Sequence, residues 1–161
     1  MVKGRISGII EQLVTRDGDM YLGILVAEEI LQPYLDQLHH HIGDVSMARY
    51  AANRKMRDGS YYHITVVNPV EYEQLFAADT AVPYGGDPLE YELVGLGYVR
   101  DSGDTTFYVI CESEAVQQLR GELGLGRKDL HVTLGFDGAD VHGVVKDLTT
   151  LIDIECQSGQ F

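Results

Sequence analysis

Two short segments of the sequence each place a histidine two residues before a threonine inside an apolar run. The segment "YYHITVVNP" contains His63 and Thr65, and the segment "KDLHVTLGF" contains His131 and Thr133. Histidine suits proton transfer near neutral pH, because its unperturbed pKa is about 6.5. A threonine hydroxyl can donate a hydrogen bond to a charged oxygen. These residue types suit acid–base chemistry on an anionic group such as a phosphate.

Both segments read as β-strands with one apolar face and one polar face. Side chains alternate between the faces of a strand, so each histidine shares a face with the threonine two residues later, about 7 Å further on. Leu130, Val132, Leu134 and Phe136 fall on the opposite face of the second segment, and Tyr62, Ile64 and Val66 on that of the first. We expect the apolar faces to line a core and the polar faces to line either a cleft or the solvent.

The remaining pattern predicts an α+β chain in which similar elements precede each motif. A strand, a helix and a loop come before the first motif strand, and a strand hairpin, a helix and a loop come before the second. Strands are predicted over 20–26, 61–67, 90–100, 105–112 and 130–136, helices over 28–42, 68–76 and 113–124, loops over 43–60, 77–88 and 137–147, and a strand or mixed element over 149–156.

Length and composition indicate one globular domain over residues 1–161. The chain has 161 residues, 45% of them hydrophobic, and a formal net charge of −13. This charge argues against a protein that grips long nucleic acid, because such binding neutralises many phosphates. It leaves room for a small anionic ligand where positive charge is local. Half of the basic residues precede one or the other motif closely: Arg49, Arg54, Lys55, Arg57, Arg127 and Lys128.

The sequence shows no feature of a membrane or secreted protein. No apolar run approaches the roughly 20 residues of a membrane helix, and the start lacks the pattern of a signal peptide. Cys111 and Cys156 each lie in an apolar segment, where we expect buried reduced thiols. We therefore expect a cytoplasmic protein without membrane association.

The paired motifs resemble those of the two-histidine (2H) phosphoesterase superfamily, which includes 2′,5′ RNA ligase-like proteins and cyclic phosphodiesterases. The resemblance covers most of the chain in order and is specific at "YHITVV" and "LHVTLGF". It implies two pseudo-symmetric lobes with antiparallel sheets around a central cleft, and His63, Thr65, His131 and Thr133 as the active set. The stretch "GRKDLHVTLGFDGADVHGVVKD" also looks like a branch associated with RNA repair.

The expected activity is metal-independent cleavage of a 2′,3′-cyclic phosphate or a related small nucleotide phosphodiester. One imidazole would remove a proton from the nucleophile and the other would supply one to the leaving oxygen, while the hydroxyls stabilise the phosphate oxygens. We expect no cofactor and no metal. The expected partner is a small nucleotide or an RNA end. Weaker candidates for substrate binding are Tyr21, Arg57, Arg127, Lys128, His142 and Lys146.

Other interpretations stay open on the sequence alone. A metal hydrolase would use His131, His142 and Asp137, although their spacing matches no zinc motif. A nucleotide-binding module or RNA-end-binding module could keep the cleft without turnover. Both motifs could also be exposed strand faces of a structural protein. Within the enzyme interpretation, hydrolysis competes with 2′-5′ RNA ligation and with cleavage of cyclic nucleotide signals.

Overall fold

The computed structural model describes residues 4–76, 88–142 and 144–152. Its elements confirm the α+β class. In chain order they are β1 Ile6–Val14, β2 Met20–Val26, α1 Glu28–Asp58, β3 Tyr62–Val67, α2 Pro69–Phe76, β4 Pro88–Asp101, β5 Asp104–Glu112, α3 Glu114–Glu122, β6 Leu130–Asp137 and the 3-10 helix η1 Leu148–Thr150.

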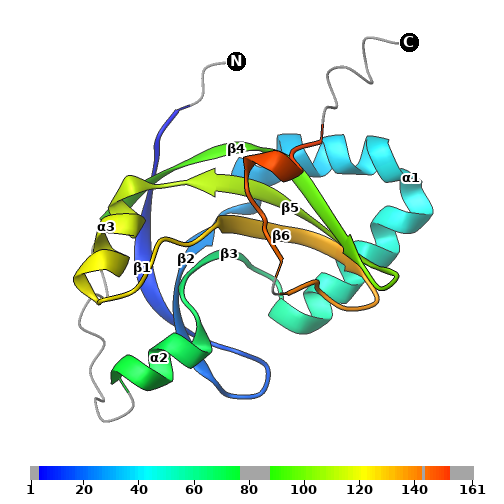
Figure 1. Cartoon of the computed structure of the whole chain (residues 1–161). Helices are drawn as coiled ribbons and strands as arrows, with labels where there is room; N and C mark the ends of the chain where they lie inside the picture. Colours follow the sequence, from blue (N-terminus) through cyan, green and yellow to red (C-terminus); the bar gives the residue numbers. More distant parts are fainter. Residues whose placement is uncertain (1–3, 77–87, 143, 153–161) are drawn as a thin grey trace.

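The six strands form one antiparallel sheet in the order β1-β2-β3-β6-β5-β4, which closes on itself because β1 also pairs with β4. The first half of the chain supplies β1 to β3 and the second half supplies β4 to β6. The two motif strands, β3 and β6, are neighbours where the halves meet (Figure 1). The predicted antiparallel arrangement of two similar halves thus takes the form of a single continuous sheet.

One face of each motif strand lies in the core, as the alternation predicted. Ile64 and Val66 of β3 and Val132 and Leu134 of β6 are completely buried. They pack in a cluster with residues of α1, α2 and the other strands. At roughly 25 cal/mol per Å² of apolar area removed from water, this burial fixes which face of each strand points outward.

The loop predicted over 43–60 is wrong, because α1 continues to Asp58. The helix contains a kink at Gly43, whose φ of 84° and ψ of 170° lie in a region open almost only to glycine. Beyond the kink, Met47 and Tyr50 pack against the core cluster and Arg54 is buried, which continues a helical spacing of three and four residues. The polar composition of this stretch hid that narrow inward face.

The second part of α1 lies against β6 just beyond the second motif. A Cβ atom at Gly135 would come within 3.0 Å of the backbone of Tyr50, so only glycine fits this approach without displacement. Asn53 also donates a hydrogen bond to the carbonyl of Phe136 over 2.8 Å. The packing brings the end of α1, with Arg57 and Asp58, toward the two motif strands.

Side-chain caps begin two of the predicted helices, and the predicted hairpin is present. Asn68 and Glu71 form a reciprocal capping box at α2, and the Ser113 hydroxyl accepts from the Val116 amide at α3. Ser102 and Gly103 adopt positive φ in the tight turn between β4 and β5. The loop predicted over 77–88 lies outside the described residues, apart from Pro88.

The chain ends differ in part from the predictions. The sequence pattern did not predict β1. Of the element predicted over 149–156, the first two residues belong to η1, and Leu151 forms a single β-bridge with Gly97. The part from residue 153 onward lies outside the described residues. Cys111 is buried as a free thiol, whereas Cys156 falls outside the described residues. Among the described helices, none combines the length and the apolar character that crossing a membrane requires.

Candidate active site

The two histidines come from adjacent antiparallel strands. Ile64 of β3 is the register partner of Val132 of β6, and it is the one pair that joins these two strands within the described residues. Continuing this register by one residue in each direction sets His63 opposite Thr133 and Thr65 opposite His131. The two histidines therefore occupy diagonal positions on neighbouring strands, and residues at such positions are about 7–8 Å apart. In this extended register, each histidine has the threonine of the other motif as its cross-strand neighbour.

A β-bulge follows each motif at the same position. In β3, consecutive residues of β2 pair with Thr65 and Val67, so Val66 is the extra residue. In β6, consecutive residues of β5 pair with Thr133 and Gly135, so Leu134 is the extra residue. Bulges bend a strand and re-aim its side chains, and they are common beside active sites. The repetition in both halves shows that the two motifs share local geometry as well as sequence.

Each imidazole has one buried ring nitrogen without a hydrogen-bond partner. Among the described residues, three buried side-chain nitrogen or oxygen atoms lack a partner, and two of them are Nδ1 of His63 and Nδ1 of His131. Unsatisfied buried polar atoms are uncommon in native structures and are often found at functional sites. Both side chains are half-buried, so the opposite edge of each ring, at Nε2, is the one left for a ligand.

His63 lies between a tyrosine and the charged end of α1. The hydroxyl oxygen of Tyr21 in β2 lies 3.5 Å from Nε2 of His63, and the centroids of the two rings are 5.4 Å apart. Burial lowers the pKa of His63, and Arg57 lowers it further, while the Asp58 carboxylate opposes this change. Burial also raises the pKa of Tyr21 to about 12, so its hydroxyl stays protonated at neutral pH.

His131 has a different electrostatic environment. Its ring meets the ring of Tyr108 from β5 edge-on, with centroids 5.5 Å apart. Burial, followed by the charge of Lys146, lowers the pKa of His131 to about 3. Lys128 adds a second nearby positive charge that acts in the same direction. At this pKa His131 is neutral at physiological pH.

A buried carboxylate joins the basic groups on the two sides of the site. Asp140 forms ion pairs with Arg57 and with Lys146, the latter over 3.5 Å, and accepts a hydrogen bond from the Thr106 hydroxyl over 3.0 Å. Only 4% of its side chain is exposed. Burial would raise the pKa of Asp140, but the two cations together hold it below its usual range. Nothing in the sequence around this aspartate indicated such a role.

Four of the six weaker binding candidates gather around the histidines. Tyr21 lies beside His63, Arg57 reaches the site from the end of α1, and Lys128 and Lys146 lie near His131. Tyr108, Asp58 and Asp140 are further residues of the site that sequence reasoning missed. For Tyr108, its place on the outward face of a strand beside a motif was the available signal.

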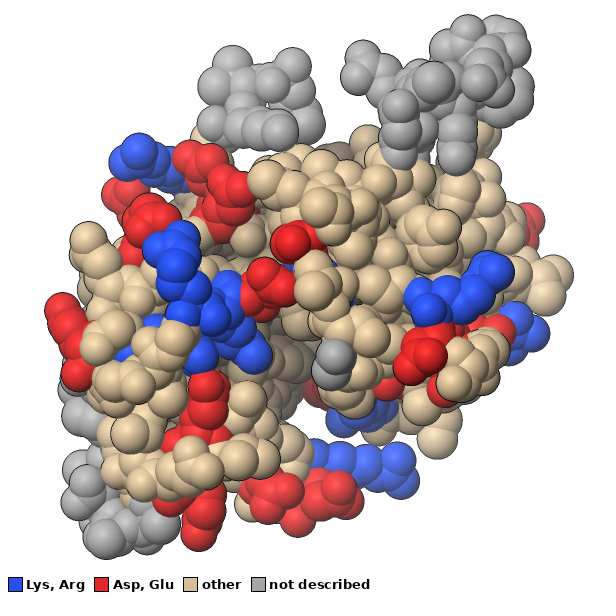
Figure 2. Space-filling view, viewed as in Figure 1, with Lys and Arg blue, Asp and Glu red and all other residues tan. Residues whose placement is uncertain are grey.

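The other two weaker candidates lie at the margin. Arg127 is exposed and pairs with Glu114 over 2.8 Å. His142 is largely exposed, with its ring 3.9 Å from Asp140. On the face drawn in Figure 2, basic and acidic side chains alternate. Across the described part of the chain, no group of three or more His, Cys, Asp or Glu side chains is placed to hold a metal ion.

Comparison with known protein families gives a match over residues 27–142 to the model described as "Swiss Army Knife, 2H phosphoesterase domain". The match covers most of the chain and contains both motifs. The chain belongs to the 2H phosphoesterase superfamily. No curated protein and no solved structure matches it.

Membership of the 2H phosphoesterase superfamily indicates, in general terms, a phosphodiesterase-type function. The matched region begins just before α1 and ends at His142, so it includes the buried Asp140 as well as both motif strands. Two imidazoles, two hydroxyls and a set of nearby cations are the groups that transfer of a phosphoryl group needs. Their chemistry supports a more specific assignment.

Proposed function

We propose that the protein cleaves a 2′,3′-cyclic phosphate, or a related small nucleotide phosphodiester such as that at an RNA end, by acid–base catalysis between its two motifs. The observation that carries this proposal is the pairing of the two motif strands at Ile64 and Val132, which brings the residues of both motifs side by side. Tyr21 and Tyr108 flank the two imidazoles in a similar way in the two halves.

The charges around the imidazoles favour different roles in hydrolysis. We assign the general base to His131, because burial and Lys146 keep it neutral and able to accept a proton from water. We assign the general acid to His63, because the Asp58 carboxylate favours its protonated form. The negative charge of a bound phosphodiester would raise the pKa of both imidazoles and supply the protonated state that the acid requires.

The reaction balances with water as the nucleophile. His131 takes a proton from water as the oxygen bonds to phosphorus, and the bond from phosphorus to one ribose oxygen breaks. That oxygen receives the proton held by His63, and the product is a phosphate monoester. Thr65 and Thr133 would donate hydrogen bonds to the non-bridging oxygens, since neither hydroxyl bonds to any described residue. Arg57, Lys128 and Lys146 would favour the anion electrostatically.

A substrate panel with histidine variants tests the assignment. The panel contains nucleoside 2′,3′-cyclic phosphates, cyclic dinucleotides and short RNA ends, so hydrolysis, ligation and cleavage of signal nucleotides are distinguished. His63→Ala and His131→Ala should each lower turnover of the best substrate by about 10²–10⁴-fold. The double variant should be little worse than either single one, because both groups act on one displacement. His40→Ala, at an exposed helical histidine, is the matched control.

Near-normal turnover in either motif variant would refute the two-histidine mechanism. Treatment with EDTA checks the metal-independent part of the proposal, and activity should survive it. Loss of activity that a single divalent ion restores would instead support metal-assisted hydrolysis.

A non-catalytic module for nucleotides or RNA ends is the second candidate. The lowered pKa values of both histidines favour it, because both rings are then neutral at physiological pH and neither is the imidazolium that a general acid requires. Binding of nucleotides without turnover of any member of the panel, and with the same affinity in His63→Ala, would support this candidate over the enzyme.

A further inference from the structure

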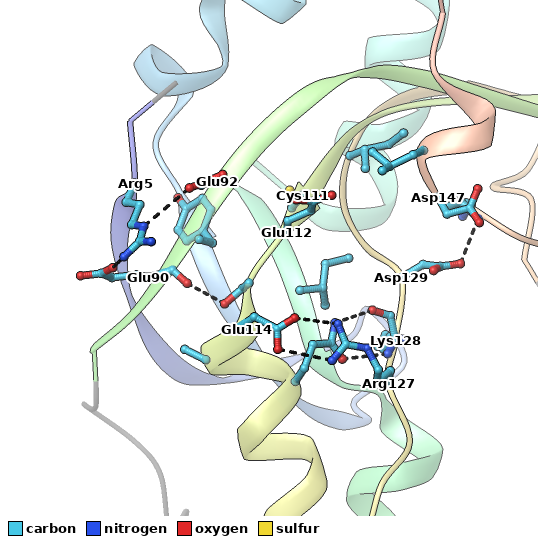
Figure 3. A pocket seen from close by; sticks show the side chains of 18 residues that line it. Arg5, Glu90, Glu92, Cys111, Glu112, Glu114, Arg127, Lys128, Asp129 and Asp147 are labelled. Atoms are coloured by element: carbon cyan, nitrogen blue, oxygen red, sulfur yellow. Dashed lines mark hydrogen bonds and ion pairs between the residues drawn. The ribbon is translucent and has the colours of Figure 1, made fainter. Parts of the chain in front are cut away.

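A pocket of about 630 Å³ opens beside the second motif but does not include either histidine. Its walls come from the start of β4, the end of β5, the start of α3, the segment that leads into β6, and the segment around η1 (Figure 3). Its volume lies in the range of sites that hold small organic ligands. The pocket is therefore distinct from the histidine site. What it could bind depends on whether the two are connected.

The pocket is continuous with the surroundings of His131. Ile110 in its wall is the register partner of His131, and Leu130 in its wall precedes His131 in the chain. Lys128 and Lys146 also line the pocket, and both are close enough to His131 to lower its pKa. If the phosphate of a phosphodiester lies between the histidines, the organic group attached to it can therefore extend beside His131 into this pocket.

The charges of the pocket indicate which chemistry it accepts. Six carboxylates and four basic side chains line it, so its charge is net negative. Arg127 pairs with Glu114, and Arg5 lies 3.4 Å from Glu90 and 3.6 Å from Glu92. Figure 3 marks these ion pairs with dashed lines. The two lysines lie on the side toward His131, together with Asp129, which accepts a hydrogen bond from the Lys146 backbone amide over 3.2 Å. This distribution disfavours a second phosphate and suits a neutral group rich in hydrogen-bond donors.

We infer that this pocket is the subsite for the nucleoside part of the substrate, whose phosphate lies between the histidines. The inference rests on the proposed function and deepens it. Ribose hydroxyls and the exocyclic amino group of a base are neutral donors that carboxylates such as Glu112 and Asp147 can accept. The phosphate then meets Lys128 and Lys146 at the inner end of the pocket. The preferred substrate is a nucleoside cyclic phosphate without an additional phosphate on the nucleoside.

A pocket-filling substitution separates the nucleoside subsite from the phosphate site. Ala115 lines the pocket in the first turn of α3, and Ala115→Trp would occupy its volume without touching either motif. The variant should raise KM for a nucleoside 2′,3′-cyclic phosphate by about tenfold or more, because the nucleoside loses its apolar and polar contacts with the pocket. Its kcat/KM for ethylene phosphate, a cyclic phosphate without a nucleoside, should stay within about twofold of the wild-type value. Ala52→Trp, at an exposed position of α1, is the matched control.

Direct binding provides a readout that does not depend on turnover. Addition of a nucleoside 2′-monophosphate should shift the methyl resonances of Ile110 and Leu148 in the wild-type protein, and Ala115→Trp should abolish these shifts. Absence of the shifts in the wild type, or equal KM changes for both cyclic phosphates in Ala115→Trp, would overturn the subsite. Shifts without hydrolysis would support the subsite while refuting the enzyme. Stronger binding when the nucleoside carries a 5′-phosphate would overturn the assigned charge preference.

Discussion

At the scale of single residues, the site depends on how buried charges are balanced around two neutral imidazoles. Burial and then nearby basic groups lower the pKa of His63 and His131, and Asp140 acts on both in the opposite direction. Asp140 also holds Arg57 and Lys146 through its two carboxylate oxygens. One side chain that touches neither histidine thus links the positive groups on both sides of the site.

Replacing this carboxylate should move the pH dependence of activity. A general acid and a general base together give a rate that is bell-shaped against pH. In Asp140→Asn, both imidazoles lose a negative charge that raises their pKa, so both limits of this profile should shift to lower pH, by about half a unit or more. Arg57, Lys146, His142 and the Thr106 hydroxyl remain around the site. The rate profile and the imidazole titrations followed by NMR check this expectation.

Asp44→Asn, at an exposed aspartate of α1, provides the control. A lower rate with unchanged pH limits would mean that Asp140 acts only as a structural anchor. A thermal melt of each variant separates that outcome from general unfolding.

At the scale of elements, two devices position the motif strands. The Arg120 side chain of α3 donates to the carbonyl of the bulged Val66, to the carbonyl of Gly126 before β6, and bidentately to Glu71 of α2. It thereby joins the segment after the first motif to the segment before the second. The kink at Gly43 lets the second part of α1 pack on β6.

Removal of the Arg120 guanidinium should be strongly destabilising. Arg120→Met removes the cation paired with Glu71 and the donor to two carbonyls, and breaking a buried ion pair in this way costs about 3–5 kcal/mol. Urea denaturation measures the change in the free energy of unfolding. Arg127→Met removes an exposed arginine from a similar pair with Glu114, and its denaturation midpoint should match the wild type. Equal midpoints for the two variants would show that Arg120 does not join the halves.

The kink should not tolerate a side chain. Gly43→Ala forces alanine into a backbone conformation that costs about 1–3 kcal/mol, although no atom lies within 4 Å of the added Cβ. Gly121→Ala in α3 also meets open space, but its backbone is helical, and it should stabilise the protein by about 0.5–1 kcal/mol. The two changes in unfolding free energy should have opposite signs. A stabilising Gly43→Ala would mean that the kink is not retained in solution.

At the scale of the whole molecule, the two neutral, half-buried histidines link stability to pH. Their pKa values are lower in the folded protein than in the unfolded chain, so the unfolded chain binds more protons as the pH falls below about 6.5. The stability is therefore fully present above that pH and is lost as the pH falls toward the folded values. The lowered pKa values of Glu71 and Asp140 begin to matter only near pH 4.5 and below.

Between pH 7 and pH 5, each histidine that stays neutral should reduce the unfolding free energy by about 1.4 kcal/mol per pH unit below its unfolded pKa. Urea denaturation at several pH values measures this slope. His131→Gln should flatten the slope, whereas His142→Gln, at an exposed ring, should leave it unchanged. An unaltered slope in His131→Gln would contradict a neutral His131.

The net charge of −13 bears on which nucleic acids the molecule can bind. Basic side chains are local and interspersed with acidic ones, as Figure 2 shows for one face. We expect long duplex RNA to bind more weakly than about 10⁻⁴ M at physiological salt, because few phosphates can be neutralised at once. Fluorescence anisotropy with a labelled duplex measures this. Tight binding that weakens steeply with added salt would contradict the expectation.

The sequence by itself determined the local parts of the fold and the polar faces of the motif strands. Alternation in "YHITVV" and "LHVTLGF" set which side chains share a face, and capping residues such as Asn68 and Ser113 set where helices begin, because these effects act within a few residues. The strand β1 escaped prediction because its buried positions break the alternation between Ile10 and Leu13.

Only the tertiary structure decided which distant groups surround the two histidines. The second part of α1 has a polar composition, and its path depends on the close packing of Tyr50 on Gly135. The ion pairs of Asp140 join residues far apart in the chain, so no local pattern encodes them. The pocket beside His131 likewise exists only where β5, α3 and the segment around η1 converge. The pKa values at the site follow from burial and from these long-range charges, which are properties of the packed molecule and not of its neighbouring residues.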